Sequence, residues 1–324
     1  MRRFSQSSTG GEFMFLVCGE ALFDLFAEAS SGDGLRFDGR IGGSPFNVAI
    51  GLARLGRRSA LFTGLSTDFL GQRLAAALTA DGVVTSFLLR KDVPTTLSLV
   101  GLAADGTPSY AFYGRGAADR SVEVAEIPPM TPEIGAVHFG SYSLVVTPTA
   151  DAFAALAARE ARRRLITLDP NVRLNVEPDL EVWRARVQTM AAHADLIKVS
   201  GEDLEAMYPG RSVEANVERW LAAGVRLVVV TRGAEGALGF TAHDRVIAAG
   251  ERVQVVDTVG AGDAFQAALL CALDELGLAS RAGLESLDEA TLGRCLSFAG
   301  RAAAITCSRR GADLPRRREL PALA

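Results

Sequence analysis

Residues that bind metals or form disulfides are scarce in this chain. Among 324 residues there are four cysteines and three histidines, and no two cysteines have the CxxC spacing of a metal or redox motif. This scarcity argues against a metal centre built from cysteine and histidine. The cysteines lie in apolar segments, where we expect reduced core residues.

Charge of one sign and long apolar runs are also lacking. The chain has 34 basic and 38 acidic residues and a net charge of −4, so it has no basic surplus of the kind that nucleic-acid binding requires. No apolar run reaches the length of a membrane span, and no segment matches a signal peptide. We therefore expect a cytoplasmic protein with no nucleic-acid or membrane partner.

Two common nucleotide-binding motifs are missing as well. The chain contains no Gly-Lys dipeptide, which excludes the GxxxxGK[ST] loop of P-loop kinases. The first glycine turn, Gly19-Glu20-Ala21-Leu22, does not fit the GxGxxG pattern of dinucleotide-binding enzymes. A nicotinamide-dependent dehydrogenase is therefore disfavoured.

Short apolar runs that are rich in β-branched residues alternate with amphipathic segments along most of the chain. This alternation predicts a single α/β domain over residues 13–320, with a mostly parallel sheet covered by helices, after a flexible tail at 1–12. Two regions, about 20–42 and 83–115, contain strand-like pieces without helices between them. We expect these pieces to form a small antiparallel sheet, which acts either as a lid that excludes water or as an ordinary edge extension without motion.

The most informative segment is Asp257–Phe265, with the sequence Asp-Thr-Val-Gly-Ala-Gly-Asp-Ala-Phe. A strand-like run, 252–256, precedes it, and a helix is expected from Asp263. A glycine loop between a strand and a helix directs free backbone N–H groups at an anion. Asp263 can take a proton from a hydroxyl that attacks a phosphoryl group held there. An ordinary acidic helix start explains the paired glycines and aspartates less well.

A second glycine motif lies at Gly42-Gly43, directly before a helix that we expect Ser44 to cap. Asn47 falls in the first turn of that helix and offers both a donor and an acceptor. Together with Asp24 it can pair with the hydroxyls of a polyol, and the glycines let a ligand approach the backbone. A capped core helix with no ligand would not explain Asn47 or the two glycines.

Together the two motifs resemble both signatures of the PfkB/ribokinase family of carbohydrate kinases. Asp169-Pro-Asn171-x-Arg173, Val230–Gly233 and Arg309–Ala312 follow in the family's order, and the resemblance covers about residues 14 to 315. The Gly42–Ala49 segment looks most like bacterial fructokinases. The resemblance implies a ribokinase-like three-layer α/β/α fold.

The resemblance also implies roles for matching positions. Asp263 would be the catalytic base, and the backbone N–H groups of Gly260, Ala261 and Gly262 would form the anion hole. The substrate would contact Asp24, Gly42, Gly43, Asn47, Arg115, Asp169, Asn171 and Arg173. The nucleotide would contact Lys198, Ser200, Thr231, Arg232, Gly233 and Gly262. Two alternatives stay open: Arg115 as a solvated loop residue, and a structural role for Arg173 at the start of the next helix.

Metal ions are implied in the same way. Val259, Thr306 and Gly311, with the carboxylate of Asp257, match the family's monovalent-cation site, so activation by K⁺ is a hypothesis. The family's Asn-x-x-Glu motif is replaced by Ser-Gly-Glu-Asp, which leaves Asp203 to act on Mg²⁺ through water. ATP can bring Mg²⁺ with its own phosphates.

The function that we favour is ATP-dependent phosphorylation of a primary hydroxyl, with fructose converted to fructose 6-phosphate. A 2-keto-3-deoxygluconate kinase or a ribokinase-like enzyme is the alternative. A sugar or nucleotide sensor without catalytic activity is the distant alternative, because a fold by itself does not establish chemistry. We expect a homodimer that forms through the lid.

Overall fold

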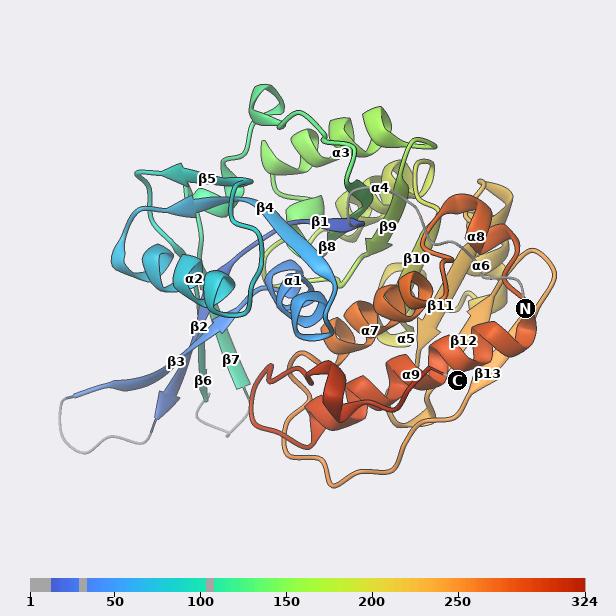
Figure 1. Cartoon of the computed structure of the whole chain (residues 1–324). Coiled ribbons are helices and arrows are strands. Elements are labelled where there is room, and N and C mark those ends of the chain that lie inside the picture. The colour runs from blue at the N-terminus through green and yellow to red at the C-terminus, as the bar shows by residue number, and fades with distance from the viewer. Residues whose placement is uncertain (1–12, 29–33, 103–107, 324) are drawn as a thin grey trace, which may run out of the picture.

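A large twisted sheet forms the centre of the computed structural model, which describes residues 13–28, 34–102 and 108–323 (Figure 1). Within these residues its strand order is β13-β12-β11-β10-β9-β8-β1-β4-β5. All neighbours from β5 to β11 pair in parallel, and β12 and β13 add an antiparallel edge. The strands are β1 (Met14–Cys18), β4 (Arg58–Ser66), β5 (Leu88–Lys91), β8 (Ile134–Gly140), β9 (Leu165–Asp169), β10 (Leu196–Ser200), β11 (Leu227–Thr231), β12 (Ala237–Phe240) and β13 (Arg245–Ala248).

Helices cover both faces of this sheet, which confirms the predicted three-layer α/β/α fold. The central strands are buried on both sides, as parallel sheets require. One apolar core joins the sheet to α1 (Ser44–Arg54), α2 (Phe69–Ala80), α7 (Ala261–Glu275), α8 (Arg281–Glu285) and α9 (Glu289–Cys307). The other core joins it to α3 (Thr149–Glu160), α4 (Leu180–Ala191), α5 (Gly201–Met207) and α6 (Val213–Ala222).

A second, four-stranded sheet projects from this body at the lower left of Figure 1. Its order is β3-β2-β6-β7, and it is called the lid sheet below. Both outer pairs are antiparallel, whereas the central β2–β6 pair is parallel. The strands are β2 (Leu22–Glu28), β3 (Arg36–Gly42), β6 (Thr96–Leu102) and β7 (Pro108–Tyr113).

Two local expectations were wrong. The lid region expected at 83–115 includes β5, but β5 pairs with β4 at the edge of the large sheet. The strand expected at 252–256 is not formed. Val255 and Val256 are 61% and 60% exposed, and the Val256 N–H donates to the carbonyl of Cys307, so this apolar run has no strand neighbour. The expected tail at 1–12 lies outside the described residues.

The cysteines are free thiols, as the sequence predicts. Three of them are buried and Cys307 is partly buried. Within the described ranges, no helix is both long and apolar enough to cross a membrane.

Candidate active site

The glycine loop before α7 has a backbone shape that only glycine adopts easily at its turning point. Gly260 has φ of 78° and forms the N-cap of α7. A Cβ there would also lie 2.7 Å from the Cβ of Ala312. Of the three predicted anion-hole amides, that of Ala261 donates to the carbonyl of Thr258 at 3.2 Å. Within the part of the chain that is described, the Gly260 and Gly262 amides have no partner and are free to bind an anion.

Asp263 lies in the first turn of α7 and is only 8% exposed. Its Oδ1 accepts a hydrogen bond from the Ser44 hydroxyl at 2.6 Å, and its Oδ2 accepts one from the Asn47 amide at 2.8 Å. Burial raises the pKa of Asp263, whereas these two hydrogen bonds and the Lys198 ammonium oppose the rise. The net pKa is above the ordinary value, which makes Asp263 a stronger base than an exposed aspartate.

The expected role of Ser44 as a helix cap was wrong. The N-cap of α1 is Gly43, with φ of 107°, and no side chain caps this helix. Ser44 is already inside the helix, and its hydroxyl reaches across to Asp263 on α7 instead. The two glycine motifs therefore meet in space, although 219 residues separate Ser44 from Asp263.

Lys198 and Asp169 form a buried ion pair beside the glycine loop. They lie near the carboxyl ends of the adjacent strands β10 and β9, and Lys198 Nζ is 2.8 Å from Asp169 Oδ2. Their side chains are 5% and 1% exposed. A Cβ added at Gly262 would lie 3.1 Å from Lys198 Nζ, so the ammonium group lies against the anion hole. It is therefore placed to neutralise a phosphoryl group there.

Asp24 faces the glycine pair from strand β2 of the lid sheet. A Cβ at Gly42 would lie 2.2 Å from Asp24 Oδ2, and one at Gly43 would lie 2.7 Å from the carbonyl oxygen of Glu20. Gly43, with φ of 107° and backbone beside it, therefore requires glycine, whereas a side chain at position 42 would displace the Asp24 carboxylate. Burial raises the pKa of Asp24, although the hydroxyl of Ser98 and the charge of Arg173 oppose that rise.

Sequence reasoning missed Glu20, which is 1% exposed and lies between β1 and β2. Its Oε1 accepts a hydrogen bond from the backbone N–H of Ser44 at 3.3 Å. Burial raises its pKa to about 7, and a hydrogen bond from the Ser141 side chain opposes the rise. A carboxylic acid between two apolar strands was the available signal. Glu20 holds the start of α1, which carries both partners of Asp263.

Asn171 and Arg173 lie on the loop that follows β9. Asn171 has φ of 41°, and its Nδ2 is buried without a partner. Arg173 is exposed and donates to the backbone carbonyls of Asn171 and Val172, yet its charge still opposes the raised pKa values of Asp24 and Glu20. The loop thus brings an arginine to the acceptor side of the site.

Asp203 supports the same loop from α5. Its Oδ1 accepts a hydrogen bond from the backbone N–H of Val172 at 3.1 Å. The Ser200 hydroxyl caps α5 by accepting the Asp203 N–H at 3.0 Å. Burial raises the pKa of Asp203, and the nearby Asp169 carboxylate raises it further. Ser200 also pairs in register with Thr231, so the two expected nucleotide-binding strand ends lie side by side.

The structure gives only local contacts for the other predicted nucleotide residues, and none for one predicted substrate residue. Gly233 has φ of 54°, and Arg232 forms an ion pair with Glu235 at 3.1 Å. Arg115 is exposed in the loop after β7, and it makes no hydrogen bond or ion pair with any described residue. The structure does not bring Arg115 to the Asp263 cluster, which favours the solvated alternative.

Asp257 ties together the segments before α7 and after α9. Its Oδ1 accepts the N–H of Val259 at 3.1 Å, and its Oδ2 accepts the N–H of Gly311 at 2.8 Å. Thr306 is buried, and its hydroxyl donates to the carbonyl of Ala302. Its hydroxyl oxygen keeps its lone pairs, so both this oxygen and the carbonyl oxygen could face an ion. Across the described residues, no group of three or more His, Cys, Asp or Glu side chains is arranged to hold a metal ion.

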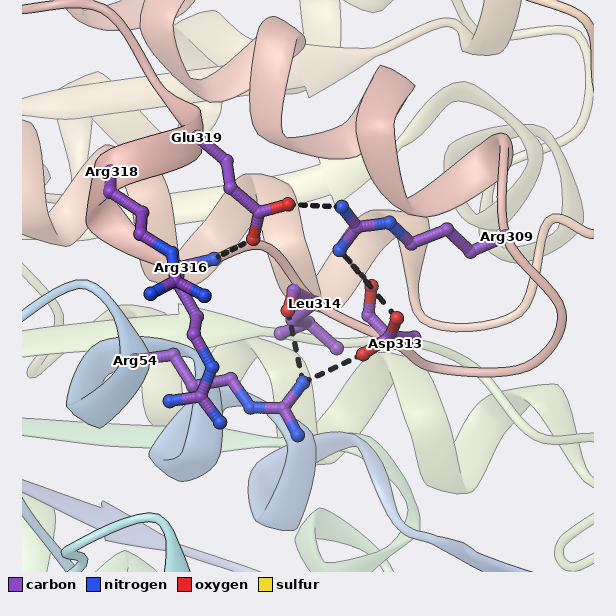
Figure 2. Close-up of a pocket in the computed structure, with 7 residues that line it drawn as sticks. All are labelled: Arg54, Arg309, Asp313, Leu314, Arg316, Arg318 and Glu319. Carbon is purple, nitrogen blue, oxygen red and sulfur yellow. Dashed lines mark hydrogen bonds and ion pairs between the residues drawn. The ribbon is translucent and has the colours of Figure 1, made fainter.

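A separate pocket of 390 Å³ lies beside α1 and the C-terminal segment (Figure 2). Figure 2 shows the guanidinium groups of Arg54 and Arg309 turned toward carboxylates, and both pair with Asp313. None of the predicted site residues lines it. These ion pairs attach the C-terminal segment to the body, so we do not place the active site there.

Comparison with known proteins identifies the family of this chain. The family described as pfkB family carbohydrate kinase matches residues 14–318. This chain belongs to that family. It is 40% identical over 279 residues to a fructokinase of Rhizobium leguminosarum bv. trifolii, covering 86% of this chain and 85% of that protein.

Solved structures of pfkB-type kinases agree with this assignment. A fructokinase from Xylella fastidiosa with bound ATP has a TM-score of 0.85 at 27% identity and covers 95% of both chains. A double mutant of a fructokinase from Vibrio cholerae O395, with fructose, ADP and potassium bound, has a TM-score of 0.80 at 28% identity, over 94% of this chain and 95% of that one. The chain is a sugar-phosphorylating enzyme of the pfkB family.

Proposed function

We propose that this pfkB-family kinase is a fructokinase, which transfers the γ-phosphoryl group of ATP to the 6-hydroxyl of fructose. The observation that carries the proposal is the buried carboxylate of Asp263, held by Ser44 and Asn47 beside two free backbone amides. Fructokinases among its relatives, with ATP or with fructose and ADP bound, support this choice of substrates.

In the proposed reaction, Asp263 accepts the proton of the sugar hydroxyl as that oxygen attacks the γ-phosphorus. The bond from the γ-phosphorus to the oxygen bridging it to the β-phosphate breaks, and ADP leaves. Asp24, Gly42, Gly43 and Asn47 hold the sugar. Because the transition state is loose, positioning contributes as much as the basicity of Asp263.

Negative charge on the transferring group is stabilised by the amides of Gly260 and Gly262 and by Lys198. Asp169 holds Lys198 in place, because a buried ammonium group needs a partner. Ser200 and Thr231-Arg232-Gly233 contact the nucleotide. Mg²⁺ bound to the ATP phosphates would neutralise their charge, and Asp203 would contact it through water.

We further propose a monovalent-cation site at Asp257. Its carboxylate already binds the amides of Val259 and Gly311, so it fixes the two segments whose carbonyls, with that of Thr306, would face an ion such as K⁺. Activity should be higher in K⁺ than in tetramethylammonium at equal ionic strength. Equal rates in the two salts would contradict this site.

We propose that residues 13–320 act as one unit, in which the lid sheet closes over the sugar and also forms a homodimer interface. Strand β3 is an edge strand, and near it Leu35 and Phe37 are 79% and 41% exposed. Exposed apolar side chains on an edge strand favour association with another chain. Light scattering should give twice the chain mass, and Phe37→Glu should halve it. A monomeric wild-type protein would contradict the proposal.

The function is tested by a coupled ADP-release assay against fructose, 2-keto-3-deoxygluconate, ribose, tagatose, glucose and adenosine. We expect the highest kcat/KM with fructose. A higher value with 2-keto-3-deoxygluconate or ribose would replace the substrate and keep the kinase. No turnover with any member, together with sugar binding by calorimetry, would support the sensor.

A further inference from the structure

Arg120 is a cation at the base of the lid that the proposed reaction does not use. It ends a short 3₁₀ helix, Ala118–Arg120. Its guanidinium carbon lies 4.9 Å from the ring centroids of both Phe112 and Tyr142. Phe112 belongs to the lid strand β7 and Tyr142 to the body, so the guanidinium stacks where lid and body meet. Stacking on two rings stabilises a charged group that is partly removed from water.

Two of the three guanidinium nitrogens have no hydrogen-bonding partner among the described residues. Its Nε and Nη2 are enclosed and unpaired, and within the described ranges no carboxylate pairs with Arg120. The neighbouring Asp119 carboxylate is occupied instead by the hydroxyls of Thr96 and Tyr142, each at 2.5 Å. Enclosed donors without partners destabilise the free protein, so their presence requires an explanation such as a ligand.

A glycine makes room for this side chain. A Cβ at Gly114 would lie 2.5 Å from Arg120 Nε and 2.6 Å from Cζ. The guanidinium therefore fills the space that any side chain at position 114 would need. Gly114 and Arg120 work as a pair, and any larger residue at 114 would push the cation out of its stack.

The face of the lid that carries this cation is the face that carries Asp24. Asp24 pairs in register with Ser98, and Ser98 pairs in register with Phe112, across β2, β6 and β7. Residues in register on adjacent strands project to the same face of a sheet. Asp24, Ser98 and Phe112 thus form one row that points toward the acceptor, with Arg120 stacked at its end.

The body side of the stack leads to the catalytic base. Tyr142 follows Ser141, whose side chain hydrogen-bonds to Glu20. Glu20 accepts the N–H of Ser44, and the Ser44 hydroxyl donates to Asp263. The ring on which Arg120 stacks is therefore connected to the reacting group through its chain neighbour Ser141, Glu20 and Ser44.

We propose that Arg120 is a specificity-determining residue that donates hydrogen bonds to a ring or hydroxyl oxygen at the end of the sugar away from the phosphorylated hydroxyl. The proposal rests on the kinase function given above. A planar guanidinium with several donors suits paired oxygen atoms. The surrounding charges favour a neutral polyol over a sugar acid, because carboxyl groups outnumber cations around the site. The carboxyl groups are Glu20, Asp24, Asp119, Asp169 and Asp263, and the cations are Arg120, Arg173 and Lys198.

The test compares Arg120→Met with a matched control, Arg211→Met. Arg211 also stacks on a ring, that of Tyr208 at 5.2 Å, but it lies outside the site. For Arg120→Met we expect the fructose Kd by calorimetry, and the fructose KM, to rise about 10- to 100-fold, the loss of a charged hydrogen bond. The KM for ATP should stay within about twofold, and the control should match the wild type. A fructose Kd within twofold of wild type would overturn the proposal.

Monodeoxy fructose analogues distinguish a direct contact between Arg120 and the sugar from a purely structural role of Arg120. In the wild type, the analogue that lacks the Arg120-bound oxygen should bind about tenfold or more weakly, and Arg120→Met should show no such loss with it. If every analogue lost the same affinity in the wild type and in Arg120→Met, a direct contact of Arg120 with the sugar would be overturned. If Arg120→Met does not fold, Arg120→Lys keeps the charge and the stack but loses the planar donor pair, and the same comparison decides.

The experiments give different results if Arg120 does not contact the sugar and if the protein is not a fructokinase. No fructose turnover by the wild type would overturn the fructokinase assignment, and the calorimetric comparison would then use whichever panel sugar the wild type binds. Tighter binding of 2-keto-3-deoxygluconate than of fructose by the wild type would contradict the selection of a neutral polyol. Wild-type binding of none of these sugars would contradict both proposals.

Discussion

The glycine loop can be tested with two glycines at opposite ends of one helix. Gly260 precedes α7 with φ of 78°, and Gly277 follows it with φ of 71°. A Cβ at Gly277 would contact nothing within 4 Å, whereas one at Gly260 would lie 2.7 Å from the Ala312 Cβ and 2.9 Å from its Cα. Alanine at either position therefore strains the backbone, but only alanine at Gly260 also collides with a neighbouring segment.

The expected magnitudes follow from this difference. A left-handed alanine costs roughly 1–2 kcal/mol, so Gly277→Ala should lower the free energy of unfolding by about that amount. Gly260→Ala should lose about 1–3 kcal/mol more, because a methyl group is forced against Ala312. The collision should also move the amides of the anion hole. We expect kcat to fall about 10²–10³-fold, as when a donor to a developing charge is lost.

Urea unfolding and the ADP-release assay on both variants test the argument. Gly277→Ala should keep kcat and the KM for ATP within about twofold of wild type, since its strain is local. Gly260→Ala should lose kcat at pH 7 while it remains folded. The reasoning would be refuted if Gly260→Ala kept wild-type kcat, or if Gly277→Ala lost as much activity as Gly260→Ala.

Three further predictions concern the buried charges. Ser44→Ala removes a hydrogen bond that lowers the pKa of Asp263, so the acidic limb of the kcat/KM profile should move to higher pH; an unmoved limb would contradict the coupling. Glu20 has a folded pKa of about 7, so the folded state binds more protons than the unfolded state between pH 4.5 and 7. As the pH rises from 4.5 to 7, the free energy of unfolding of the wild type, measured by urea titration, should fall by about 3 kcal/mol more than that of Glu20→Gln. The same pH dependence in both proteins would argue against this role of Glu20. Lys198→Met should raise the KM for ATP, and it should lower the free energy of unfolding by about 3–5 kcal/mol because Asp169 is left unpaired. The double variant with Asp169→Asn should regain the stability but keep the raised KM.

The sequence predicted those features that arise from local patterns. The parallel strands follow from short β-branched runs that are buried on both faces, and α7 follows from the apolar segment after the glycine loop. The apolar run at 252–256 has the same pattern as a strand. It forms none, because among the described residues no strand lies beside it, and the N–H of Val256 donates to the carbonyl of Cys307 instead.

The contacts between distant segments could not be predicted in this way. Ser44 satisfies every local rule for a helix cap, but its hydroxyl is instead used by Asp263, which is remote in sequence. Arg115 and Arg120 both follow the lid strand β7, and sequence reasoning considered only Arg115, as a substrate contact or as a solvated loop residue. Only the packing shows that the side chain of Arg120 fills the space left by Gly114.

The central claim is that Asp263 accepts the proton of the sugar hydroxyl, and Asp263→Asn tests it most directly. Asparagine keeps the size of the side chain and can still bond to Ser44 and Asn47, but it cannot take up the proton. In a coupled ADP-release assay with fructose and ATP, the account predicts a kcat about 10²–10⁴-fold below wild type, with fructose still bound in calorimetry. Wild-type turnover by Asp263→Asn would contradict it.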